Sequence, residues 1–248
     1  MITPKILYNH TQGNKISVIV SNISSRLIDD LLESKLDALW QEQARKCHEK
    51  GEKVWDGISY RLNTLSLKDN TLNVELGPIR WSKRSPIRSI DEIHQLDEEY
   101  WGRGVFVTAL ICTSDGKYIF GERKKTVIKR TMSTTIGGIL SSEEVKVDSF
   151  DDFFTMLHKE IHEEIGVTAD HIIKENFLGV VYSAKADVGF IFTVTLNLSS
   201  QDINTLFQKR SDDELALLRF VESESLKTHL MEMGDYWALI PEFIDEQK

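Results

Sequence analysis

The chain has 248 residues, of which 41% are hydrophobic and 28% are charged, and its formal net charge at pH 7 is -9. This length allows one large domain or two smaller ones, with a sizeable core. The acidic balance argues against non-specific binding to nucleic acid or to an acidic membrane surface, because both need a basic face on the protein. A small substrate that carries phosphate remains compatible, because a bound cation can supply positive charge locally.

The cysteine content and the apolar runs bear on the cellular compartment. Cys47 and Cys112 are spaced neither as metal ligands nor as a disulfide framework. The sequence shows no basic-then-apolar signal segment at its start, and no apolar run has the length that spans a bilayer. We therefore expect a protein of the reducing cytoplasm, with neither a membrane partner nor a nucleic-acid partner.

The N-terminal part of the sequence shows the patterns of a small α+β unit. Short strands are expected at residues 5–8 and 16–20. Residues 25–49 carry leucines at helical spacing, which predicts a long amphipathic helix. Segments 59–67 and 71–76 alternate apolar and polar residues on either side of a Lys-Asp-Asn sequence, which is typical of a hairpin.

The segment after this hairpin, residues 81–89, is basic and contains Pro86, so we expect a loop there. Beyond it, apolar runs at 105–112 and 117–123 flank a Ser-Asp-Gly-Lys sequence, which predicts a second hairpin. The sequence Thr-Thr-Ile-Gly-Gly at 134–138 indicates a short strand that enters a glycine turn, where the backbone can approach a ligand closely. Further strands are expected at 177–182, 189–196 and 215–221, and helices at 224–233 and 237–246.

The most informative segment is Lys-Glu-Ile-His-Glu-Glu-Ile-Gly-Val at residues 159–167. Glu160, Glu163 and Glu164 are spaced i, i+3 and i+4, so on a helix they lie on one side. Like charges at this spacing repel one another, and a hard divalent cation such as Mg²⁺, which takes oxygen ligands, would offset the repulsion. A solvated acidic helix surface is the alternative interpretation.

The residues before these glutamates predict the helix that would carry them. Ser149 can cap its N-terminus, with Asp152 as the partner in a capping box. Gly166 is expected to end the helix in a left-handed conformation. An apolar stripe at helical spacing should face the core. It consists of Phe150, Phe153, Phe154, Leu157, Ile161 and Ile165.

Together with Gly138 upstream, residues 159–167 resemble the Nudix box, in which a Gly and a Glu precede the sequence Arg-Glu-hydrophobic-x-Glu-Glu-x-Gly. Three features depart from that pattern. Lys159 stands in place of the arginine, which keeps the charge but loses the planar guanidinium. Asp151 occupies the position of the first glutamate, and the loop between Gly138 and Asp151 is longer than the spacing in the family.

The resemblance implies a Nudix fold of the α/β (α+β) class, which is an α/β/α sandwich with a mixed sheet. We expect this domain over residues 99–248, preceded by a small α+β domain over residues 1–98. By the same resemblance, Glu160, Glu163 and Glu164 hold Mg²⁺, with Mn²⁺ as a substitute. The implied reaction is hydrolysis of the diphosphate bond in a nucleoside diphosphate that is joined to another group.

The catalytic residues implied by the resemblance are Glu163, Glu164 and Lys159. One of the two glutamates would act as a base, and Lys159 would hold a glutamate in place. Nudix enzymes often pair, so the resemblance also allows a homodimer. The residues expected to bind the substrate are Arg123, Lys124, Gly137, Gly138, Tyr60 and Arg61.

A second resemblance narrows the substrate. Residues 36–40, 55–57 and 60–62 precede a hairpin in an order similar to that of the UDP-sugar diphosphatase branch of the Nudix superfamily. The basic run at 120–125 also falls ahead of the glycine pair, as in that branch. This resemblance implies that UDP-glucose, or another UDP-sugar, is hydrolysed to UMP and a sugar 1-phosphate. It also motivates the hypothesis that residues 1–98 cap the substrate and help to select it.

Alternatives of other classes stay open, among them hydrolysis of ADP-ribose or another nucleotide, and a nucleotide sensor without catalysis. A diphosphate isomerase would need a reactive cysteine, and Cys112 in an apolar run is a poor candidate. His158 and His162 could bind zinc, but the metalloprotease motif needs a glutamate where Lys159 stands. The acidic residues 212–214 could add a ligand or a base, although a solvated turn is the expected interpretation.

Overall fold

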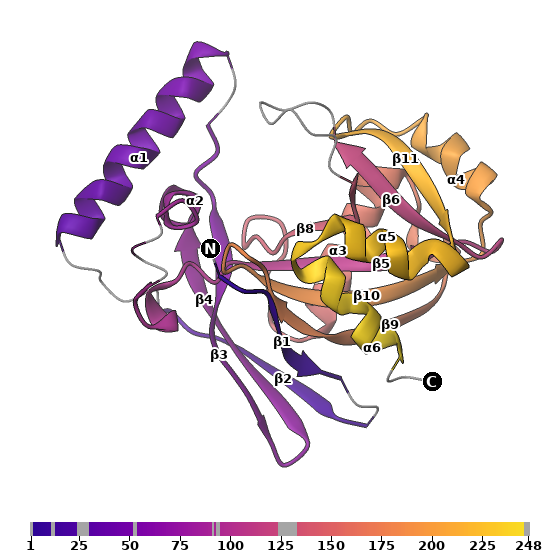
Figure 1. Ribbon diagram of the computed structural model, residues 1–248, viewed down its shortest axis with the longest axis horizontal. Coiled ribbons are helices and arrows are strands. Elements are labelled where there is room, and N and C mark those ends of the chain that lie inside the picture. The colour runs from indigo at the N-terminus through magenta and orange to yellow at the C-terminus, as the bar shows by residue number, and fades with distance from the viewer. Residues whose placement is uncertain are drawn as a thin grey trace.

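The computed structural model describes residues 2–10, 13–23, 30–51, 54–90, 92, 95–123 and 133–245. Within these residues the chain forms two sheets, one of eight strands and one of three (Figure 1). None of the helices described there is both long and apolar enough to cross a membrane.

The larger sheet is mixed, as the resemblance to the Nudix fold implies. Its strands are β1 (Lys5–Asn9), β5 (Val105–Cys112), β6 (Lys117–Arg123), β7 (Ser133–Thr134), β8 (Ile136–Ile139), β9 (Ile172–Tyr182), β10 (Val188–Leu196) and β11 (Leu215–Glu222). Their order is β1-β9-β10-β5-β6-β11, with β8 paired to β5 and β7 paired to β6. The pair β10 and β5 is parallel, whereas the others are antiparallel.

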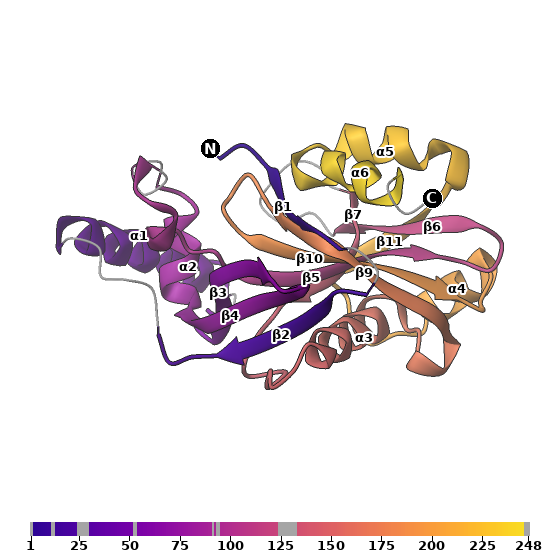
Figure 2. The ribbon, with the colours of Figure 1, turned by 90° about the horizontal axis from the view of Figure 1, so that it is seen from below.

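Helices cover both faces of this sheet (Figure 2). On one face lies α3 (Asp151–Ile165), whose Leu157 belongs to the larger buried apolar cluster. On the other face lie α5 (Leu226–Met233) and α6 (Ile240–Asp245), and Leu230 of α5 belongs to a second cluster. The expected α/β/α sandwich of the α/β class is therefore confirmed.

The smaller sheet belongs to the N-terminal part of the chain. Its strands are β2 (Lys15–Val20), β3 (Ile58–Lys68) and β4 (Thr71–Arg80), in the order β2-β4-β3. The predicted hairpin is confirmed, since β3 and β4 pair antiparallel along their length. The predicted long helix is α1 (Asp30–Glu49), which lies at the opposite end of the molecule from β11 (Figure 1).

The prediction of a loop at residues 81–89 is wrong. Trp81–Ile87 form a short helix, α2, which packs against α1. Pro86 is compatible with it because the proline falls in the last turn, where it removes a single backbone donor. Burial of Arg84, Pro86 and Ile87 then favours the helix over a solvated loop.

One strand crosses the predicted boundary at residue 98. β1 precedes it in the sequence, yet pairs with β9 in the larger sheet. The two parts also share one buried apolar cluster. Isolated bridges join Ser59 to Ser141 and Arg61 to Gly104. The division into two domains otherwise remains a prediction.

The remaining elements are short helices that connect the larger strands. The strands expected after the carboxylate helix and the two C-terminal helices are confirmed, but α4 was not expected. It begins with a capping box, in which Ser199 and Asp202 each bind the other's backbone N–H. The short connecting helices are η2 (Glu98–Tyr100), η3 (Ala169–His171), α4 (Ser200–Phe207), η4 (Ser223–Ser225) and η5 (Asp235–Leu239).

Candidate active site

The helix that carries the glutamates is held to the sheet by its apolar stripe. Four residues of the stripe are fully buried, and Met156 adds to them. Gly166 ends the helix with a φ of 76°, as predicted. At the start, Asp152 accepts the backbone N–H of Ser149 at 2.7 Å, but the Ser149 hydroxyl donates to Asp152 and caps no described helix amide. The fully buried residues of the stripe are Phe153, Leu157, Ile161 and Ile165.

The prediction of a glycine turn at Gly137 and Gly138 is wrong, because both lie inside β8 and pair with β5. Gly137 has a φ of 151°, and a Cβ there would lie 2.2 Å from the Val107 carbonyl oxygen. A Cβ on Gly138 would lie 2.1 Å from Glu160 Oε1. The glycine pair therefore lets the carboxylates of α3 lie directly against the backbone of a central strand.

Glu164 is the most deeply buried of the three glutamates, with 2% of its surface exposed. Its Oε2 accepts the Gly137 N–H at 3.0 Å. Burial is the main reason that the pKa of its carboxyl is raised to about 8. The Gly137 bond and the charge of Arg123 lower this pKa, whereas the charges of Glu160 and Glu214 raise it. Without a cation nearby, this carboxyl is therefore protonated over much of the neutral range.

Glu160 is partly buried beside it. Burial raises the pKa of its carboxyl to about 7, against the opposing effect of Lys159. Glu144, Glu163 and Glu214 each raise it further. The two inward carboxyls thus lie in an environment that disfavours negative charge, which is the condition that a divalent cation would relieve.

Glu163 points outward and is 45% exposed. Lys159 Nζ donates to Glu163 Oε2 at 2.6 Å and lies 3.6 Å from Glu144 Oε2. Burial alone would lower the pKa of Lys159, but the bond to Glu163 and the charge of Glu144 raise it overall. The structure thus places the lysine where it can hold a glutamate, and it adds Glu144 as a neighbour that the sequence did not indicate.

The arrangement fits a metal ion in part. In the described part of the chain, no three Asp, Glu, His or Cys side chains lie together as a complete metal-binding group. Mg²⁺, however, is usually held by one or two carboxylates, with water and substrate phosphates as its other ligands. Glu160 and Glu164, with raised pKa values and close to each other, fit that role. Glu163 would first have to leave Lys159.

Arg123 lies at the end of β6, where it forms an ion pair with Glu214. The pairing of Leu215 with Arg123 brings the residue before β11 to this edge of the sheet. Glu214 is about half exposed, as expected for a solvated turn, yet its charge raises the pKa of both inward glutamates, so the turn lies near them. Lys124, the other predicted phosphate-binding residue, lies outside the described residues.

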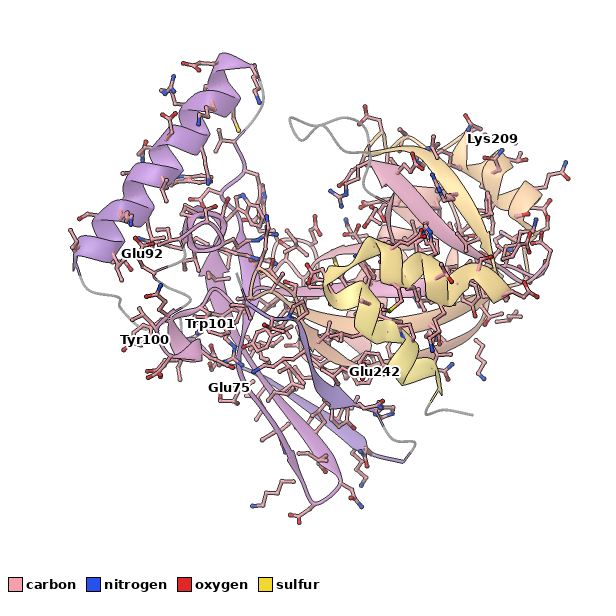
Figure 3. The ribbon with its side chains drawn as sticks, viewed as in Figure 1. Glu75, Glu92, Tyr100, Trp101, Lys209 and Glu242 are labelled. Carbon is pink, nitrogen blue, oxygen red and sulfur yellow. The ribbon has the colours of Figure 1, made fainter. Side chains whose placement is uncertain are left out.

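Tyr60 and Arg61 occupy the junction between the two parts of the chain. Tyr60 is 6% exposed, and its hydroxyl accepts the Val147 N–H at 3.2 Å. Arg61 is 4% exposed, and its Nη2 donates to the carbonyl oxygens of Glu99 and Trp101, the latter labelled in Figure 3. Because their polar groups bind the protein itself, their predicted role in substrate binding gains no support.

Two further candidates have structural partners. His158 Nε2 lies 2.6 Å from Glu175 Oε2 on β9, and His162 is exposed, which agrees with the interpretation of both as ordinary helix residues. Cys112 lies four residues along β5 from Thr108, the partner of Gly137. At the rise of a strand this is about 13 Å, and burial raises the pKa of the thiol, so the isomerase interpretation gains nothing.

Comparison with known proteins gives structural matches alone. No protein-family model and no curated protein matches the chain. A Nudix hydrolase from Nitrosomonas europaea is 18% identical, covers 58% of this chain and 87% of its own, and has a TM-score of 0.39. The MutT protein of Methanosarcina mazei is 15% identical, with coverages of 58% and 95% and a TM-score of 0.38.

The Nudix domain of NrtR from Shewanella oneidensis, solved with ADP ribose, is 11% identical, with coverages of 58% and 88% and a TM-score of 0.40. In each case a little over half of this chain is matched.

Proposed function

We propose that this protein is a Nudix-type pyrophosphohydrolase that cleaves the diphosphate bond of a nucleoside diphosphate linked to a second group. The observation that carries the proposal is the pair of inward carboxylates, Glu160 and Glu164, held against the glycines of β8. A buried acidic pair of this kind lowers the stability of the fold unless a positive charge compensates it, and such pairs are typical of functional sites. In this proposal the compensating charge is a divalent cation, Mg²⁺ or Mn²⁺, which in turn binds the diphosphate.

Each residue of the site then has a distinct task. Glu164 is fixed by the Gly137 N–H and presents its second oxygen as a ligand. Glu160 presents a carboxylate from the adjacent turn of α3. A bound cation would neutralise charge on the diphosphate and lower the pKa of a coordinated water.

The outward glutamate is the base in this proposal. Glu163 is exposed, and the bond from Lys159 fixes the direction of its carboxylate. Arg123 can exchange Glu214 for a phosphate oxygen, because both side chains are about half exposed.

For the substrate, we propose a UDP-sugar such as UDP-glucose, with UMP and a sugar 1-phosphate as products. The support is the order of sequence features in residues 36–62. The N-terminal part, which packs on the same core as α3, would act as the cap that selects the nucleoside. ADP-ribose and other nucleotides are the alternative substrates, and the cytoplasm is the proposed compartment.

The test is product release from a panel of UDP-glucose, ADP-ribose, NADH, diadenosine polyphosphates and nucleoside triphosphates with Mg²⁺. Glu164→Gln should keep the bond to Gly137 yet lower kcat by about 100-fold or more, because it removes a charge that acts on the bound cation. Glu175→Gln is the matched control, since that carboxylate binds His158 of the same helix away from the site. Equal activity of the wild type and Glu164→Gln would refute the proposed site.

A sensor without catalysis would give a different pattern. Such a protein would turn over no panel compound, with or without Mg²⁺, while still binding a nucleotide. Calorimetric titration of Mg²⁺ into the wild type and into Glu164→Gln separates the two cases further. If Mg²⁺ binds neither protein, the carboxylates are no metal site and the proposal fails.

A further inference from the structure

A second buried charge cluster lies where α2 meets the turn between β9 and β10. Arg84 is 1% exposed, and its Nε and Nη2 each lie 3.1 Å from Asp187 Oδ1. Arg88 Nε lies 3.1 Å from Asp187 Oδ2, which is ion-pair distance, but it is not aligned for a hydrogen bond. The Asp187 N–H donates to Ser183 Oγ at 3.1 Å, which fixes the turn that presents the carboxylate.

The charges of this cluster do not balance. Two guanidinium groups share one carboxylate, so one positive charge is left without a partner in the cluster. Burial lowers the pKa of Arg84, and the charge of Arg88 lowers it too, while Asp187 opposes both. A buried cation is costly unless it is paired, so this arrangement favours the arrival of an anion.

Hydrogen-bond donors are also left over. Arg84 Nη1 is buried and has no hydrogen-bond partner among the described residues, although this nitrogen carries two N–H groups. Nearly all buried polar groups in proteins are bonded, so such an exception needs an explanation. The free donors of Arg84 and the misaligned Nε of Arg88 belong to one cluster around Asp187.

The surroundings fix Arg84 in place. A Cβ on Gly104 would lie 2.0 Å from Arg84 Nε, so the backbone before β5 lies directly against the guanidinium. The Trp81 ring lies 5.5 Å from Arg84 Cζ, at cation–π distance. The Arg88 side chain is 31% exposed, whereas Arg84 Nη1 and Arg88 Nε are buried, so an anion would reach these two donors only when Arg88 shifts.

We propose that Arg84 and Arg88 form a binding site for a phosphate-type oxyanion, separate from the glutamates of α3. Guanidinium groups suit this ligand because their planar N–H pairs match the oxygens of phosphate. The oxyanion would take the free donors of Arg84 and balance the surplus charge. The site does not depend on the proposed hydrolase activity, and its anion can be free phosphate or a phosphate group of a nucleotide.

The first test uses inorganic phosphate and the full chain, with EDTA present so that no divalent cation can link phosphate to the glutamates. The Tm in millimolar phosphate is compared with the Tm in chloride at equal ionic strength. Wild type should gain about 2 to 4 °C, and Arg88→Gln should lose most of that gain. Arg80→Gln should keep it, because Arg80 is an exposed arginine beside Asp56 that flanks the same helix.

Two results would overturn this proposal. One is a wild-type protein whose Tm is the same in phosphate and chloride. The other is an equal gain in the wild type, Arg88→Gln and Arg80→Gln, which marks a general salt effect. Failure of the hydrolase proposal would leave the test intact, because the readout is the Tm of the metal-free protein.

The source of the anion is decided by kinetics, once a substrate of the panel is known. If phosphate raises the KM of the wild type but not that of Arg88→Gln, the site takes a phosphate of the nucleotide itself. If phosphate binds in the first test and leaves the KM unchanged, the site takes a free anion. Either result supports the site and names its occupant.

Discussion

The glutamates at β8 and the arginines at α2 are two buried charge clusters of opposite sign that are built in the same way. Each brings a long charged side chain against a glycine of the central sheet region, where a Cβ would collide with it. The distances are 2.1 Å for Gly138 against Glu160 and 2.0 Å for Gly104 against Arg84. In both clusters, like charges outnumber their partners.

The difference between the clusters lies in where the opposite charge is found. Asp187 is buried within the arginine cluster, whereas Lys159 and Arg123 lie at the margin of the glutamates and are partly exposed. The arginine cluster therefore contributes to holding α2 on the sheet. The buried glutamates oppose folding, and in the proposed function a bound cation would offset this cost. Removing charge from the two clusters should thus change stability in opposite directions.

The largest effect is expected from Asp187→Ala, which leaves two guanidinium groups without their carboxylate. The free energy of unfolding should fall by about 3 to 5 kcal/mol, measured by urea denaturation. Asp148→Ala is the control, since that carboxylate is 68% exposed and pairs with Lys146 at the surface. An equal decrease in the free energy of unfolding in both variants would show that the buried cluster stabilises the protein no more than a surface ion pair does.

The next effect concerns pH. The carboxyls of Glu160 and Glu164 have pKa values of about 7 and about 8, above the ordinary value of 4.5, so the unfolded chain releases these protons first. The free energy of unfolding of the metal-free protein should therefore fall as pH rises from 4.5 to about 8, and the loss should be complete above that. A loss on the order of a few kcal/mol is expected in EDTA.

Urea denaturation at a series of pH values measures this loss. The double variant Glu160→Gln, Glu164→Gln should lack this pH dependence and should be more stable than the wild type at pH 8. Mg²⁺ should restore stability to the wild type alone. A wild-type protein whose stability is level across this range would contradict the described burial of the two carboxyls.

A smaller effect is expected from Gly138→Ala. The new Cβ meets the end of a flexible side chain, so Glu160 is displaced and the fold survives. Activity should fall by about 10- to 100-fold through weaker Mg²⁺ binding, with a stability change of about 1 kcal/mol. Gly102→Ala is the control, because a Cβ there makes ordinary contacts of 3.4 Å or more. Normal activity in Gly138→Ala would show that the position of Glu160 is unimportant.

The smallest effect is expected at Lys159. Lys159→Met should change stability by less than about 1 kcal/mol, because its ion pairs are partly exposed. It should lower kcat by about 10-fold if it fixes the direction of Glu163, and Lys159→Arg should restore most of the activity. Lys146→Met, at an exposed lysine, should leave kcat unchanged. A loss in Lys159→Arg as large as in Lys159→Met would contradict this role.

Sequence patterns predicted the elements that depend on local periodicity and turn chemistry. The stripe on α3, its end at Gly166 and the hairpin of β3 and β4 are of this kind. The glycine pair was misassigned to a turn, because its conformation is set by contact with β5 and α3. α4 could have been predicted, since Ser199 and Asp202 form a recognisable capping box.

Other features had no local signal at all. Arg84 and Asp187 lie 103 residues apart, and pairing of β9 with β10 and of β10 with β5 brings them together. Glu214 joins the glutamates because β11 pairs with β6, which an acidic run before an apolar segment does not reveal. The three glutamates lie on one side of the helix, yet Glu163 contacts Lys159 whereas Glu164 points inward to Gly137. This difference arises from tertiary packing and has no signal in the local sequence.

The place of β1 has a consequence for how the chain is made and handled. Residues 5–9 form β1 and pair with β9, which begins at residue 172. The pairing of β1 with β9 therefore cannot form until most of the protein has been synthesised. Until then β1 offers unpaired backbone groups to any other extended segment. Pairing across so long a separation also slows folding. A purification tag is therefore better joined at the C-terminus, and truncation before β2 should favour aggregation.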